Sequence, residues 1–134
     1  MASKNAAFEY RKQAVGGASP LQLVIMLYDG AIRFMEAGKQ AMAHGDLPGQ
    51  NDNLQRAQKI VLELMSCLDM AKGGEIASNL LALYTYIVNE LVEANVADNP
   101  ECIERCIKIL SDLRSGWSGI EQATHQDHEQ PIAA

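Results

Sequence analysis

The sequence contains few of the side chains on which catalytic centres are built. Among its 134 residues are 3 histidines and 3 cysteines, and aromatic residues make up 5%. His44 falls between two predicted helices, and His125 and His128 fall in the C-terminal segment, so no imidazole is placed to act as an acid or base inside a domain. The glycine-rich motifs that hold phosphates are absent as well. We therefore expect a protein that is not an enzyme and that needs no cofactor.

Metal binding is also disfavoured. The chain has an odd number of cysteines, Cys67, Cys102 and Cys106. The spacing of Cys102 and Cys106 places both on one face of a helix. These two thiols could supply two ligands, but no second cysteine or histidine pair occurs near the spacing of a structural zinc site. The Glu-x-x-His pairs of di-iron bundles are missing too. We expect reduced, buried thiols and no metal.

Long hydrophobic runs are absent. The longest extends from Leu23 to Tyr28, far short of the roughly 20 residues that span a bilayer, and residues 1–12 lack the apolar region of a secretory signal. The formal net charge is -6, and a basic balance is confined to residues 1–19, whereas nucleic-acid binding needs a clustered basic face. We expect a cytoplasmic protein that neither inserts into a membrane nor binds nucleic acid.

One helix start is clearly marked. Ser19 can accept the free amide hydrogens of a first helical turn, Pro20 fits the first helical position, and Gln22 completes a Ser-x-x-Gln capping box. The helix that follows, 20–43, carries two apolar stripes at helical spacing, one through Tyr28 and one through Leu27. One stripe packs in a core, so the second needs a partner of its own.

The rest of the chain shows the same period. Helices are predicted over 20–43, 48–70, 75–95 and 100–120, with Gly73-Gly74 as a tight turn between the second and third, and no segment alternates like a strand. Four helices joined by short connections pack as antiparallel neighbours. We predict an all-α, antiparallel up-down four-helix bundle over 19–121, preceded by a short mobile segment, 1–18, and followed by a disordered acidic tail, 122–134.

Second apolar faces on three of the helices predict a binding surface, because a monomer seldom exposes large apolar patches. The candidate groove residues are Ile60, Cys67, Met70, Ala77, Leu81, Val88, Val92, Cys102 and Ile109. Before the bundle, Phe8, Tyr10 and Val15 are apolar residues in a polar segment that ends in Gly16-Gly17, and they are candidates for a lid over this groove. The alternatives are that the second faces are covered in a homodimer and that the start of the chain folds onto the end of the bundle.

Four blocks of the sequence resemble the flagellin export chaperone family, FliS. They are residues 10–15 ahead of Ala18-Ser19-Pro20, the block 26–34, the block 73–77 with Asn79-Leu80 and Leu83-Tyr84, and the block 110–117. Their order and separations fit the family over about residues 8–117. Thr85 departs from the acid that the family often has there, and Gly16-Gly17 replaces a more polar pair.

The resemblance implies a cytoplasmic chaperone that holds the disordered C-terminal segment of flagellin, prevents its premature polymerisation and delivers it to the flagellar type III export gate. It further implies that the segment around Tyr10 covers the client groove when the chaperone is empty. The partners expected are thus flagellin, a component of the export gate and, weakly, a second copy of the chain. A self-assembling helical bundle without a dedicated client is the alternative function.

Overall fold

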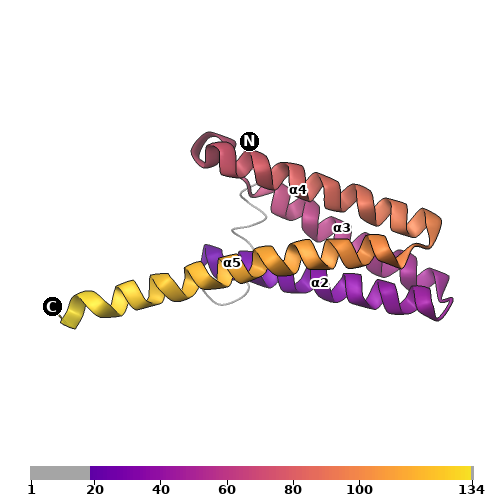
Figure 1. Cartoon of the computed structure of the whole chain (residues 1–134), viewed down its shortest axis with the longest axis horizontal. Helices are drawn as coiled ribbons and strands as arrows, with labels where there is room; N and C mark the ends of the chain where they lie inside the picture. Colours follow the sequence, from indigo (N-terminus) through magenta and orange to yellow (C-terminus); the bar gives the residue numbers. More distant parts are fainter. Residues whose placement is uncertain (1–18, 134) are drawn as a thin grey trace.

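The computed structural model describes the backbone of residues 19–133 and the side chains to Ala123. It contains four helices, α2 (Pro20–Ala43), α3 (Leu47–Ser66), α4 (Met70–Ala97) and α5 (Pro100–Ala133), and no strand within this range (Figure 1). Each helix packs against the next in the chain, and α5 packs back against α2, which closes the ring. The predicted antiparallel up-down four-helix bundle is confirmed. Residues 1–18, which include the candidate lid residues Phe8, Tyr10 and Val15, lie outside the described residues.

Side-chain caps fix the helix starts that the sequence marked. At α2, Ser19 Oγ accepts from the Gln22 amide at 3.1 Å and Gln22 Oε1 accepts from the Ser19 amide at 3.0 Å, so the predicted capping box is present. At α3, Asp46 Oδ1 accepts from the Gly49 amide at 3.1 Å. These bonds pair amide hydrogens that have no partner inside the helix.

The boundary between α3 and α4 differs from the prediction. α3 ends at Ser66, and α4 begins at Met70 behind the N-cap Asp69, whose Oδ1 accepts from the Lys72 amide at 3.0 Å. The prediction that a helix runs to Met70 and that Gly73-Gly74 forms the interhelix turn is therefore wrong. Gly74 instead makes a kink inside α4, with φ 51° and ψ -126°, a conformation open mainly to glycine. The continuing apolar period concealed the cap at Asp69.

The last helix is also longer than expected. The backbone of α5 is helical to Ala133, past the end expected near Ile120, and this part extends beyond the other helices (Figure 1). Gly116 and Gly119 each weaken a helix by about 1 kcal/mol relative to alanine, but neither ends it. The described part of the predicted tail, 122–133, thus has helical backbone.

Buried residues from all four helices form one core. Those with the largest fully enclosed side chains are Tyr28, Met35, Leu54, Val61, Tyr84, Ile87, Leu91, Cys102, Ile103, Cys106 and Leu110. At the end of the bundle where α3 begins and α4 ends, the buried Gln50 donates to Asn95 Oδ1 at 3.1 Å and to Asp98 Oδ1 at 2.9 Å. This end is therefore closed by both packing and hydrogen bonds.

α2 and α3 are the most closely packed pair because glycine faces the partner helix. A Cβ at Gly38 would lie 2.7 Å from Leu54 Cδ2 and 3.0 Å from its Cγ, and Leu54 is fully buried. Gly116 in α5 faces open space, with nothing within 4 Å of a built Cβ. A substitution at Gly38 therefore tests close packing, whereas the same substitution at Gly116 tests helix propensity alone.

We expect Gly38→Ala to lower the free energy of unfolding by about 1–3 kcal/mol, because overpacking against Leu54 outweighs the gain in helix propensity. The matched variant Gly116→Ala should raise it by up to about 1 kcal/mol. Urea denaturation followed by circular dichroism measures both. Equal stabilisation by the two substitutions would show that α2 and α3 are not packed this closely.

Candidate binding cleft

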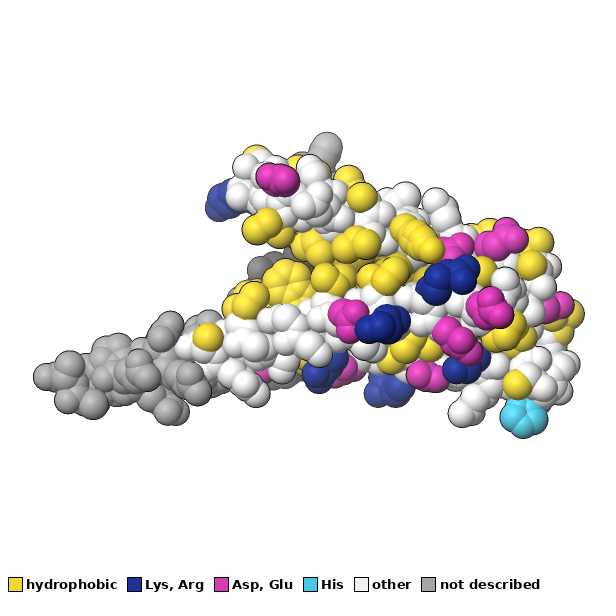
Figure 2. Space-filling model, viewed as in Figure 1, with side chains coloured by type: hydrophobic (Ala, Val, Ile, Leu, Met, Phe, Trp, Pro, Cys, Tyr) yellow, Lys and Arg dark blue, Asp and Glu magenta, His cyan; other side chains and the backbone are white. Residues whose placement is uncertain are grey.

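A cleft of about 380 Å³ opens at the end of the bundle where α2 begins and α3 ends. Figure 2 shows hydrophobic side chains on both sides of a hollow between the first turns of α4 and the middle of α5. The cleft is lined by Leu21, Val24, Leu64, Cys67, Leu68, Asp69, Lys72, Gly73, Ile76, Ala77, Leu80, Tyr84 and Trp117. Apolar side chains predominate in this lining, so the cleft suits an apolar occupant.

A pair of tyrosines lies where the closed core meets the cleft. Tyr28 of α2 and Tyr84 of α4 are buried, their rings pack edge to face with centroids 6.3 Å apart, and their hydroxyl oxygens lie 2.5 Å apart in a hydrogen bond. Burial raises the pKa of both phenols above the usual 10, which keeps both neutral at physiological pH. Tyr84 also lines the cleft, so this contact forms part of its floor.

The structure brings a minority of the predicted groove residues to this cleft. Cys67 and Ala77 line it, and Met70, 44% exposed, stands at the start of α4 close to it in the chain. Ile60, Val88 and Ile109 are half-buried and pack against the core, and Leu81 is half-buried as well. Val92 is 48% exposed, whereas Cys102 is 2% exposed. The predicted residues therefore lie on several surfaces and do not form one continuous groove.

The residues that sequence reasoning missed come from the core stripes. Leu21, Val24, Leu80 and Trp117 keep the helical period of their helices, and they line the cleft because no helix covers them at this end of the bundle. Periodicity identifies an apolar face but not whether a neighbour covers it. The glycine pair Gly73-Gly74 was the sequence signal for an irregular helix at this end of the bundle, where Gly74 makes the kink in α4.

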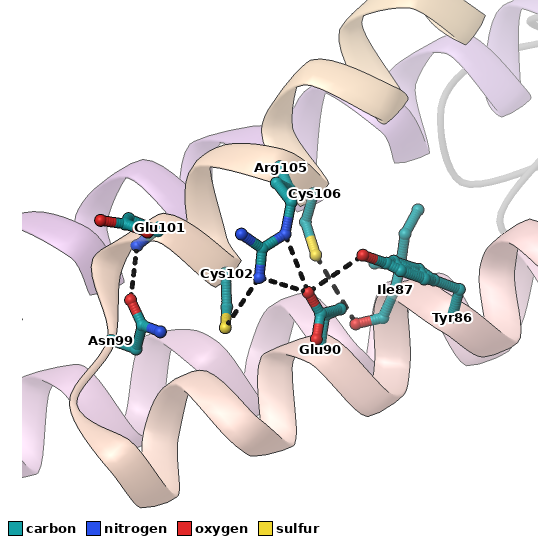
Figure 3. A network of polar contacts seen from close by, with 8 residues as sticks. All are labelled: Tyr86, Ile87, Glu90, Asn99, Glu101, Cys102, Arg105 and Cys106. Carbon is teal, nitrogen blue, oxygen red and sulfur yellow. Dashed lines mark hydrogen bonds and ion pairs between the residues drawn. The ribbon is translucent and has the colours of Figure 1, made fainter.

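A second, more polar surface lies between α4 and α5. Arg105 of α5 contacts Glu90 Oε1 of α4 through Nη2 at 2.8 Å and Nε at 3.1 Å, and the Tyr86 hydroxyl donates to the same oxygen (Figure 3). The bonds from Arg105 and, to a smaller extent, Tyr86 lower the pKa of Glu90. Ile109 and Lys108 border this surface. Its charges give it less affinity for an apolar segment than the cleft has.

The cysteines offer no reactive thiol in the core. Cys102 and Cys106 are buried, and burial raises the pKa of Cys106 to about 12, so its thiol stays protonated at neutral pH. Across the side chains that the structure describes, no three histidines, cysteines or acids gather as metal ligands. None of the described helices has the length and hydropathy of a membrane span.

The fold and the cleft together define an all-α bundle protein with an apolar recess at one end of a closed core. The model of the family described as "Flagellar protein FliS" matches residues 2–124. The chain belongs to this family.

Curated relatives agree with this assignment. The chain is 38% identical over 120 residues to the flagellar secretion chaperone FliS of Vibrio cholerae, an alignment that covers 87% of this chain and 88% of the relative. It is 30% identical over 127 residues to the protein of the same name from Bacillus subtilis, with coverage of 95% and 94%. A solved structure titled "Crystal structure of flagellar chaperone from bacteria" superposes with a TM-score of 0.74 at 19% identity, covering 90% of this chain and 98% of that one, and supports the fold.

The hydrogen bond of the tyrosine pair can be tested by comparing single substitutions with the double substitution. Tyr28→Phe or Tyr84→Phe alone leaves the other hydroxyl buried without its partner, and each should lower the free energy of unfolding by about 1–3 kcal/mol. The double variant removes both hydroxyls and should be closer to the native chain than the sum of the single losses. Denaturant unfolding of the four proteins measures this. Additive losses would show that the two hydroxyls do not interact.

Proposed function

We propose that the chain is a cytoplasmic chaperone that binds the C-terminal segment of flagellin, one client to one chaperone, without catalysis. Family membership supports the class, since the relatives carry the name flagellar secretion chaperone. The observation that carries the client site is the apolar cleft at the open end of the bundle. By holding the segment there, the chaperone prevents premature polymerisation and delivers flagellin to the flagellar type III export gate.

Physical chemistry favours an amphipathic helical client. A segment that becomes helical on binding lays its apolar face into a hydrophobic groove. Ile76, 70% exposed at the cleft, and Met70 give it uncovered aliphatic surface. Farther along α4, Leu81, Val88 and Val92 follow at helical spacing, so we propose that the client contacts this helix beyond the cleft. Cys67 and Ala77 contribute to the cleft itself. Ile60 and Ile109, which are half-buried, are proposed as further contacts, and the buried Cys102 would contribute only by packing behind them.

The lid is proposed from where α2 begins. Leu21, in the first turn of α2, lines the cleft, so the chain before Ser19 starts beside it. Residues 1–18 would then place Phe8, Tyr10 and Val15 within reach of the apolar lining. A short segment stabilises the closed form by only a few kcal/mol at about 25 cal/mol per Å², and a client that buries more area displaces it.

Exposed aliphatic residues also occur at the opposite end of the bundle, and these favour the alternative of self-association. Leu47 is 60% exposed and Val96 77% exposed, and both border a shallow hollow there. A homodimer through this end would leave the cleft open, so a weak dimer is compatible with client binding. Light scattering of the purified chain measures the oligomeric state, and a stable dimer that binds no client would support the alternative.

Calorimetric titration with a peptide of the flagellin C-terminal segment tests the proposal. We expect one-to-one binding with a large negative heat-capacity change, because coupled folding buries roughly 1,000–3,000 Å². Ile76→Asp should weaken binding about tenfold or more by placing a charge at the cleft, whereas the matched variant Val96→Asp, on the same helix at the opposite end, should stay within about twofold. Both should melt as the native chain does. Absence of binding at micromolar concentration would refute the proposal.

The lid predicts a gain of affinity when it is removed. A chain that starts at Ala18, or the variant Tyr10→Ala, should bind the same peptide roughly 3- to 10-fold more tightly, because the closed population no longer competes. Both should also bind more of a dye that reports exposed apolar surface. If affinity and dye binding match those of the full chain, residues 1–18 do not cover the cleft.

A further inference from the structure

One hydrogen-bond donor in the wall of the cleft has no partner among the described residues. Trp117 of α5 lines the cleft, and its indole Nε1 is enclosed, with no acceptor from the described part of the chain within hydrogen-bond geometry. Enclosed donors are paired in the great majority of cases, and an unpaired one is costly because it has lost its bond to water. Within residues 19–123, this donor therefore lacks the acceptor that an enclosed N–H normally has.

Neighbouring groups do not meet this requirement. The Tyr28 hydroxyl oxygen is bonded to Tyr84 and could still accept a second hydrogen bond, but Trp117 makes no bond of ordinary geometry to it. The polar side chains at the cleft include Asp69, whose Oδ1 is held by the Lys72 amide in the cap of α4. The missing acceptor is not supplied by these groups.

We propose that the Trp117 N–H is the donor that fixes the register of the bound client, by donating to a main-chain carbonyl oxygen of the segment in the cleft. This inference rests on the proposed function, because it names the chemical group of the client that the same cleft recognises. A neutral carbonyl is the acceptor that fits, since the N–H is uncharged and the one acid and one base in the lining, Asp69 and Lys72, leave no net positive charge to favour an anion. Carbonyls are free in extended peptides and in the last turn of a helix.

The enclosed position of Nε1 has a consequence for binding. An acceptor reaches this atom only if the indole turns or the cleft widens, so binding changes the surroundings of Trp117. The cleft is bordered by the start of α4, which follows a short turn that ends at Asp69. Gly74 interrupts the helix there, so this border is the part of the cleft where a widening is expected. Trp117 is the single tryptophan of the chain, and its fluorescence therefore reports this site alone.

The test replaces the donor while keeping the shape. Benzothienylalanine at position 117, an indole analogue with sulfur in place of the ring N–H, and the variant Trp117→Phe are titrated with the flagellin C-terminal peptide beside the native full-length chain. Both should bind about 5- to 10-fold more weakly, the loss expected for one buried hydrogen bond. The free analogue protein should melt at or above the native temperature, because an unpaired donor has been removed. Ile120→Ala, on α5 and half exposed, is the control and should bind as the native chain does.

The outcomes separate this inference from the proposed function. If the native chain binds the peptide with a shift in tryptophan emission and the analogue binds more weakly, the donor role stands. If the analogue binds as tightly as the native chain, the donor role is refuted while the chaperone function remains. If Trp117→Phe melts early but the analogue does not, the analogue alone decides. Binding by the native chain without any change in emission would also overturn the inference.

Discussion

The hydrogen bond between Tyr28 and Tyr84 divides the molecule into two parts. It joins α2 and α4, which are opposite each other in the ring of helices, and its two side chains are buried. On one side of it, the side chains of four helices fill a closed core. On the other side lies the cleft, with Tyr84 in its lining. A hydroxyl pair can occupy this boundary because each phenol is apolar over most of its surface and polar at its tip.

The closed part explains how the chain can keep an apolar recess uncovered. Gly38 lets α2 and α3 approach closely over Leu54, and Gln50 connects the start of α3 to the end of α4. Between α4 and α5, Glu90 and Arg105 form an ion pair at the surface, and an exposed pair of this kind contributes little to stability. The end of the bundle away from the cleft is thus closed by close packing and by hydrogen bonds. The cleft end can consequently carry exposed residues such as Ile76 without unfolding the domain.

Most of the fold was predictable from local signals, and the cleft was not. The capping box at Ser19 and the stripes through Tyr28 and Leu91 depend on residues within one or two turns, so the sequence displays them. The cleft depends on where a neighbouring helix stops, which is a relation between distant segments. For the same reason Cys102, on an apparently second face, is buried, whereas Leu21 and Trp117, on core stripes, line the cleft. The cap at Asp69 was a local signal that the continuing apolar period concealed.

The division of the bundle into a closed core and a cleft also bears on how a client could be bound in one register. A recess of purely apolar side chains holds any segment of suitable size, because apolar contact is non-directional. One donor such as the Trp117 N–H adds direction, since a client placed out of register leaves it unpaired. Because the donor has no partner among the described residues of the free chain, a bond that forms only with the client lowers the free energy of the bound state relative to the free state. Selectivity for register can thus arise at the cleft while the closed core stays unchanged through binding and release.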